Sequence, residues 1–130
     1  MSNWRRKAVE TFPDLRHEFE KPDTTIYGVF FELLPRVRDA HDRQDTPELE
    51  RIYGFAEWCF RQKSEDLSNA AAVSFYEHLV DEQLTRRQIP RWIQPNDFEA
   101  LKPLFEDRLR PEQFKKLCES YARRYGTKAT

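Results

Sequence analysis

The chain has 130 residues, of which 38% are hydrophobic, 35% charged and 14% aromatic, and its formal net charge is −1. This length fits one domain with a real core, and the many aromatic residues argue against disorder despite the high charge. The balanced charge excludes a global attraction to nucleic acid or to an anionic membrane, and no stretch is apolar enough to span a bilayer.

Helical periodicity recurs along the chain while hairpin signals are missing, so we predict a single all-helical domain over residues 1–130. Residues 1–24 are expected to hold a first helix, from about Asn3 to Phe12, followed by a loop. The first residues lack the apolar stretch that a secretory signal peptide requires. The last residues, 127–130, are expected to be frayed.

The second helix is predicted from about Thr25 to His41, with Pro35 inside it. Its apolar residues share one side, as a period of 3.6 requires: Ile26, Phe30, Leu33, Leu34 and Val37. His41 falls on the same side at the C-terminal end. A histidine there is expected to be structural and hydrogen-bonded, with a ligand or a catalytic base as the alternative.

The third helix is predicted to begin with Thr46 as N-cap and Pro47 at its first position. Its inner stripe is Leu49, Ile52, Tyr53, Ala56 and Phe60. Phe55 and Trp58 fall outside that stripe, so we expect this helix to be covered on more than one side. We expect the first or the last helix to cover most of Trp58 and to leave its edge for binding, with a fully buried Trp58 that has no binding role as the alternative.

The fourth helix is predicted from Ser64 or Leu67 to Arg86. Its apolar side holds Ala72, Val73, Phe75, Tyr76, Leu79, Val80 and Leu84, and its polar side holds Ser74, Glu77, His78, Asp81 and Glu82. Three polar groups side by side on one helix make a poor catalytic triad, and one histidine makes a poor metal site. The polar side is therefore expected to be a solvated face, with a recognition face as the alternative.

The segment TRRQIPRWIQPND, residues 85–97, is predicted to be irregular, with Asn96 as the N-cap of a fifth helix. Arginines with an aromatic ring, here Arg86, Arg87 and Arg91 beside Trp92, can hold phosphate and stack a base. An ordinary loop with Trp92 in the core is the other interpretation. The remaining basic pairs, Arg5–Arg6 and Arg123–Arg124, lie at the two ends of the chain, which weakens the nucleic-acid interpretation.

The last helix has the clearest boundaries, with Pro111 at its start and Gly126 just past its end. The two cysteines, Cys59 and Cys118, have no metal-ligand spacing and fall on apolar faces. We therefore expect buried free thiols, which fit a reducing cytoplasm. No metal and no cofactor is expected.

Five to six antiparallel helices result, arranged either as a closed bundle or as stacked helical hairpins. The paired helices PELERIYGFAEWCFRQK and SEDLSNAAAVSFYEHLVDEQL resemble a hairpin of short bacterial helical-repeat proteins of the HEAT/armadillo kind, over roughly residues 25–110. The resemblance implies a protein-binding surface and does not specify a partner.

We therefore expect a non-enzymatic cytoplasmic interaction module of the adaptor, regulatory or immunity type. Its partner would be another protein; nucleic acid and membrane are not expected, and a homo-oligomer is left open. The candidate partner-binding residues are Trp58, Trp92, Arg87, Arg91, Glu77, His78 and Asp81. The alternative is a small helical enzyme or ligand-binding bundle with His41 in an interhelical pocket; a deep polar cavity at His41 would favour it, and a solid aromatic core would not.

Overall fold

The computed structural model describes residues 1–126, and the predicted frayed tail lies outside them. Within these residues the chain forms eight α-helices, two 3-10 segments and no strand, so the all-α prediction is confirmed. The helices outnumber the predicted five to six. The reason is that one short extra helix forms near the N-terminus and that the predicted fourth helix is divided.

The chain divides into two compact units, one over Met1–Phe75 and one that begins at Tyr76. The first unit contains α1 (Asn3–Thr11), the 3-10 turn η1 (Pro13–Leu15), α2 (Arg16–Phe19), α3 (Ile26–Arg43), α4 (Thr46–Phe60) and α5 (Glu65–Ser74). The second unit contains the 3-10 segment η2 (Tyr76–Asp81), α6 (Gln83–Trp92), α7 (Pro95–Arg108) and α8 (Pro111–Tyr125). Whether the chain acts as a single domain stays a prediction.

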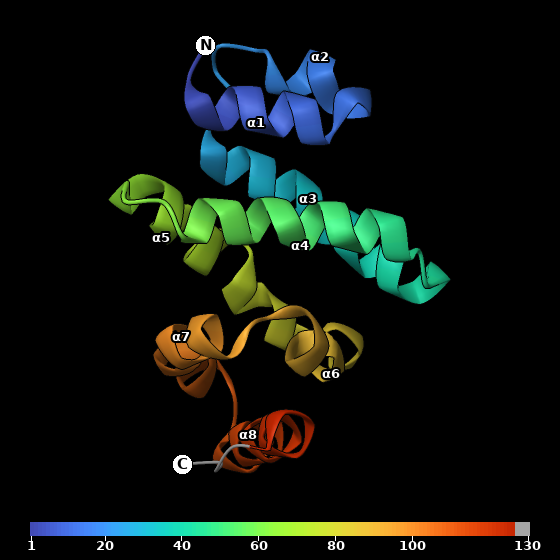
Figure 1. Cartoon of the computed structure of the whole chain (residues 1–130), viewed down its shortest axis with the longest axis vertical. Coiled ribbons are helices and arrows are strands. Elements are labelled where there is room, and N and C mark those ends of the chain that lie inside the picture. The colour runs from blue at the N-terminus through green and yellow to red at the C-terminus, as the bar shows by residue number, and fades with distance from the viewer. Residues whose placement is uncertain (127–130) are drawn as a thin grey trace. The chain divides into compact units, whose positions relative to one another are not determined.

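The core of the first unit is aromatic. Helices α3, α4 and α5 pack on one another, and α1 packs against α3 and α4 (Figure 1). Neighbouring ring centroids lie 5.6–6.3 Å apart along one chain of contacts through Phe19, Phe12, Phe55, Phe30, Phe75, Tyr53 and His41. Tilted and edge-on rings at such distances are the favoured arrangements, so this unit has a solid core.

Two polar networks hold the N-terminal segment of the first unit in place. Arg5 donates to the backbone carbonyls of Phe19, Lys21 and Thr24 at 2.5–2.9 Å, which closes the loop after α2 over α1. Arg36 of α3 binds Asp14 at 2.9 Å and the buried carboxylate of Glu48 at 2.7 Å. Arg51 pairs with the other oxygen of Glu48, so the buried charge is compensated on both sides.

Helix α4 begins one residue earlier than predicted. Its N-cap is Asp45, whose carboxylate accepts from the backbone N–H of Glu48 at 3.2 Å, while Thr46 is already helical. Aspartate caps a helix as well as threonine does, and Pro47 is tolerated within the first turn. The capping prediction at Thr46 was therefore wrong by one position.

Helix α4 is covered on more than one side, as expected from Phe55 and Trp58. Phe55 is buried against Phe12 and Phe30, and it stacks on Trp58 with a centroid distance of 6.4 Å. Trp58 is partly buried, and the Lys7 ammonium of α1 lies 5.7 Å from its ring. The first helix thus covers one face of this indole.

The predicted fourth helix does not exist as one element, because α5 ends at Ser74 and η2 begins at Tyr76. Phe75 leaves the helical region with φ −129° and ψ −73°. Its ring packs on Phe30 and Tyr53 in the first unit, whereas the next residues belong to the second unit. Packing in two separate cores outweighs the weak helix propensity of a β-branched and aromatic run.

The predicted faces fail at two places in this stretch. Ser74, expected on the solvated side, is buried, and Leu84, expected in the apolar side, is 40% exposed. For Leu84 the reason is η2, whose rise and rotation per residue differ from those of an α-helix, so that faces stepped at 100° lose their register beyond it. Ser74 is the last residue of α5 and precedes η2, so its burial has no such explanation. Thr85, near the end of the predicted helix, is fully buried instead, and its hydroxyl donates to the Leu79 carbonyl.

The core of the second unit is a ladder of rings on α7 and α8. Phe105, Phe98, Tyr121 and Tyr125 follow one another, with Phe98 and Tyr121 stacked at 4.0 Å. The Tyr121 hydroxyl donates to the carbonyl of Ile93, and burial raises the pKa of Tyr121. Through these contacts α8 packs against the end of α6 and against α7.

The segment predicted to be irregular is mostly helical. Helix α6 runs to Trp92 with Pro90 in its last turn, so the proline removes only one backbone hydrogen bond. The Tyr125 hydroxyl donates to the carbonyl of Pro90 at 2.6 Å. Helix α7 begins at Pro95 after the N-cap Gln94. Asn96 is therefore inside the helix and is not its cap, because proline suits the first helical position.

Candidate functional site

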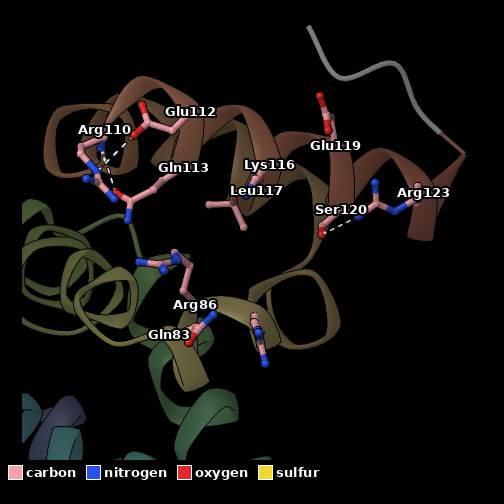
Figure 2. A pocket seen from close by; sticks show the side chains of 11 residues that line it. Gln83, Arg86, Arg110, Glu112, Gln113, Lys116, Leu117, Glu119, Ser120 and Arg123 are labelled. Carbon is pink, nitrogen blue, oxygen red and sulfur yellow. Dashed lines mark hydrogen bonds and ion pairs between the residues drawn. The ribbon is translucent and has the colours of Figure 1, made fainter.

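A surface hollow of about 590 Å³ lies between α6 and α8 of the second unit. Figure 2 shows Gln83 and Arg86 of α6 facing the α8 side chains of Gln113, Leu117 and Ser120. Its volume is within the range of pockets that hold small ligands or several side chains of a partner. The complete lining is Gln83, Arg86, Arg87, Arg110, Glu112, Gln113, Lys116, Leu117, Glu119, Ser120 and Arg123.

The hollow is strongly basic although the chain as a whole is not. Five of its lining residues are cationic and two are acidic, a local excess of three positive charges, whereas the chain carries −1. Glu112 pairs with Arg110 at 3.3 Å, and Glu119 points away from α6 (Figure 2). A concave surface with one sign of charge attracts the opposite sign.

The cationic side chains of the hollow differ in whether they already make hydrogen bonds or ion pairs within the chain. Arg86 donates to the Val80 carbonyl at 3.0 Å, and Arg123 donates to the Ser120 hydroxyl at 3.1 Å. Within residues 1–126, Arg87 and Lys116 make no hydrogen bond or ion pair, and both are exposed. These two can bind an anion without breaking an existing contact.

Helix α8 presents this surface because its residues recur at helical spacing. Gln113, Lys116, Ser120 and Arg123 are separated by three, four and three positions, which places them along one side. Gln113 also accepts from the backbone N–H of Arg110 at 3.1 Å, which fixes the start of the helix. Gly126, with φ +68°, ends it in the left-handed conformation that glycine favours.

Two other hollows lie in the first unit and lack this charge excess. One, of about 520 Å³, is lined by one lysine and two acidic residues among neutral side chains. The other, of about 480 Å³, contains Arg5 and Asp66, and the guanidinium of Arg5 is already bound to three carbonyls. The hollow between α6 and α8 is therefore the better candidate for recognition.

Of the residues predicted to bind a partner, Arg87 lies in this hollow. Arg91 and Trp92 sit together at the end of α6, with the guanidinium 5.7 Å from the indole, and neither lines the hollow. Trp58 belongs to the first unit. The remaining lining residues were not among the candidates, and Arg86 was named only as part of the basic segment beside Trp92.

The position of Arg123 corrects an argument made from the sequence. Arg123–Arg124 was discounted because it lies near one end of the chain, yet α8 brings Arg123 into the same hollow as Arg86 and Arg87. Distance along a chain says little about distance in space once helices pack. The two-turn spacing between Lys116 and Arg123 is the signal in the sequence that could have revealed this face.

Glu77, His78 and Asp81 form a separate cluster around Arg108 of α7. Arg108 binds both oxygens of Asp81 at 2.7 Å, and His78 Nδ1 lies 3.1 Å from the second oxygen. Glu77 lies 3.7 Å from the same guanidinium. The three residues share a surface as predicted, but they lie on a 3-10 segment and are bound to α7 instead of standing free on an α-helix.

Acid is expected to weaken this cluster. Partial burial works to raise the pKa of Asp81, but the hydrogen bonds from Arg108 and His78 outweigh it and lower the pKa below its ordinary value. The carboxylate therefore stabilises the second unit fully above the ordinary pKa of about 4, and this stabilisation is lost as the pH falls through the lowered pKa.

This can be measured by denaturant melts between neutral and acid pH, followed by the fluorescence of Trp92 in a variant with Trp4→Phe and Trp58→Phe. Asp81→Asn should reduce the loss of stability in acid, and Glu106→Gln, at an exposed position on α7, should not. Equal acid sensitivity in all three proteins would contradict the assignment to Asp81.

His41 is buried in the first unit, and its Nε2 lies 2.7 Å from the Tyr53 hydroxyl. It lines none of the three hollows described above. The thiols of Cys59 and Cys118 are free and buried, as predicted, and burial raises the pKa of Cys59 to about 12. A thiol with such a pKa stays protonated and is a poor nucleophile.

Within residues 1–126, two other kinds of feature are absent. No group of three or more His, Cys, Asp or Glu side chains there is arranged to hold a metal ion. No helix there combines the length and the apolar character needed to cross a membrane.

A family model described as Domain of unknown function (DUF7674) matches residues 5–110. The chain belongs to this family. The part shared with DUF7674 covers the first unit from Arg5 onward together with η2, α6 and α7, and it ends just before α8 begins. Most of the hollow's lining, from Glu112 to Arg123, comes from beyond that part. No curated protein and no solved structure matches the chain.

Proposed function

We propose that this DUF7674 protein is a non-enzymatic protein-binding module, and that its partner binds the basic hollow between α6 and α8. The observation that carries the proposal is the excess of cations in an open hollow, with Arg87 and Lys116 unpaired among the described residues. Charged surfaces of this kind raise association rates and select partners of opposite charge. Helical hairpins of the HEAT/armadillo kind would supply the scaffold, and the free buried thiols support a reducing cytoplasm as the compartment.

The alternative, a helical enzyme or ligand-binding bundle that uses His41, has less support. His41 is the last ring in a chain of packed aromatic side chains and is already hydrogen-bonded to Tyr53. A general base needs a substrate within hydrogen-bond reach, and a buried ring that lines none of the described hollows offers little access. The structural role of His41 is thus the better-supported interpretation.

Retention of cell proteins by the immobilised chain tests the proposal when two charge-reversed variants are compared. Lys116→Glu with Arg123→Glu changes the hollow. Lys115→Glu with Arg124→Glu changes the neighbouring positions of the same helix, which are equally exposed and outside the hollow. Both pairs change the net charge by the same amount.

We expect the wild type and the Lys115/Arg124 variant to retain the same proteins from a lysate of the source cells, and the Lys116/Arg123 variant to lose them. Circular dichroism would establish that both variants keep their helices. Retention that is the same in all three proteins, or lost equally in both variants, would contradict a role for the hollow.

A further inference from the structure

Two cations of α8 that line the hollow, Lys116 and Arg123, form a row along the helix, and Arg110 stands before them at the N-cap. Lys116 follows Arg110 by six residues and Arg123 follows Lys116 by seven, which corresponds to about 9 Å and about 10.5 Å along the axis. Lys116 and Arg123, two turns apart, lie on the same side. A partner that binds along this row therefore meets two positive charges about 10.5 Å apart along the axis.

An extended peptide segment can match this spacing. In the polyproline II conformation, which is common in unfolded segments, the chain repeats every three residues and rises about 3.1 Å per residue. Every third side chain then projects to the same side, about 9 Å from the last. A carboxylate at every third position would face the row of cations on α8.

We propose that the hollow binds an acidic peptide segment in an extended conformation, with a carboxylate at about every third position. This inference rests on the proposed function, because it names the partner of the same hollow. Arg87 on α6 and Lys116 on α8, both exposed and unpaired within residues 1–126, are available to carboxylates of the segment from the two sides of the hollow.

The neutral residues of the hollow suit a peptide backbone. Gln83, Gln113 and Ser120 offer donors and acceptors between the charges, and Leu117 supplies an apolar contact. A polyproline II segment has no internal hydrogen bonds, so its amides and carbonyls are free to pair with such side chains. The hollow therefore offers partners both for the side chains and for the backbone of the segment.

Two observations disfavour a nucleic acid in the same place. Glu112 and Glu119 come between the cations in the α8 sequence, so a strand with uniform negative charge would run past two carboxylates of its own sign, one of them paired with Arg110 and the other pointing away from α6. No aromatic residue lines the hollow, whereas single-stranded nucleic acid sites rely on bases stacked against aromatic rings. A peptide with spaced acidic residues avoids the first difficulty and has no need of the rings.

Fluorescence anisotropy with three labelled probes tests the proposal on the full chain. The first is a peptide of about twelve residues with glutamate at every third position and serine or alanine between, a length that spans the row of cations. The second has the same composition with its glutamates in one block. The third is a single-stranded oligonucleotide of equal net charge.

We expect the spaced peptide to bind most tightly and to weaken with added salt, because the contacts are exposed charges. Lys116→Glu with Arg123→Glu should weaken it at least about tenfold, and Lys115→Glu with Arg124→Glu by no more than about twofold. Equal affinity for the block peptide, or tighter binding of the oligonucleotide, would overturn the proposal.

The outcome also separates this inference from the proposed function. If no peptide binds while retention of cell proteins still depends on Lys116 and Arg123, the proposal of an acidic segment is wrong and the proposal of a protein-binding module is kept. If both effects are absent, both proposals are wrong.

Discussion

Replacement of Phe75 by alanine is expected to lower the free energy of unfolding by about 3–5 kcal/mol, among the largest effects of any single substitution in this chain. The ring is fully buried and lies 5.7 Å from Phe30 and 5.9 Å from Tyr53. Its loss would leave a cavity at the last residue of the first unit, where α5 has already ended.

Denaturant melts followed by circular dichroism would measure this loss, with Phe31→Ala as the matched control. Phe31 is 57% exposed on α3, so the same truncation there should change stability by no more than about 0.5 kcal/mol. Similar losses at Phe75 and Phe31 would mean that the core of the first unit has been placed wrongly.

In the second unit, two substitutions of Tyr121 are expected to lower the free energy of unfolding by different amounts. Tyr121→Ala removes a ring stacked on both Phe98 and Tyr125 and should lower the free energy of unfolding by about 3–5 kcal/mol. Tyr121→Phe keeps the ring but leaves the Ile93 carbonyl without the hydroxyl that donates to it, which should lower the free energy by about 1–3 kcal/mol.

Tyr27→Phe is the control for the hydroxyl. The Tyr27 hydroxyl accepts from the exposed Asn69 side chain at 3.0 Å, and its loss should be nearly neutral because water replaces it. Denaturant melts followed by circular dichroism report on both units, the second with Tyr121 and the first with Tyr27. A Tyr121→Phe variant as stable as the wild type would show that the bond to Ile93 contributes nothing.

The helices with strong end signals were predicted well from the sequence. The predicted start of α8 at Pro111 and its end before Gly126 agree with the structure, because proline at the first turn and glycine just past the last act through local backbone geometry. The apolar stripe of α3 is buried as expected, from Ile26 to Val37. Such features depend on neighbours in the chain and so can be read from it.

The division of the predicted fourth helix depends on distant residues. No proline or glycine lies between Ser64 and Arg86, and nothing local marks Phe75 as an end. Its conformation follows from packing on Phe30 and Tyr53, which are 45 and 22 residues away in the chain. Contacts between residues distant in the chain override helix propensity, and the periodicity of a single segment carries no information about such contacts.

The basic hollow was partly visible in the sequence. Arg86 and Arg87 were recognised as a basic cluster, whereas the spacing of Lys116 and Arg123, which puts two more cations on one side of a helix, was not used. What the sequence lacked was the contact of α6 with α8, which the bonds of Tyr121 and Tyr125 to carbonyls near the end of α6 create. Only that contact turns two separate basic stretches into one hollow.

A titration of the isotope-labelled full chain with the spaced acidic peptide, followed by nuclear magnetic resonance, tests most directly that the hollow is the binding surface. We expect the amide signals of α6 and α8 to shift, with the largest changes at Arg87, Lys116 and Ser120, and added salt to reverse them. Shifts centred on the first unit, or on the cluster around Arg108, would contradict this expectation.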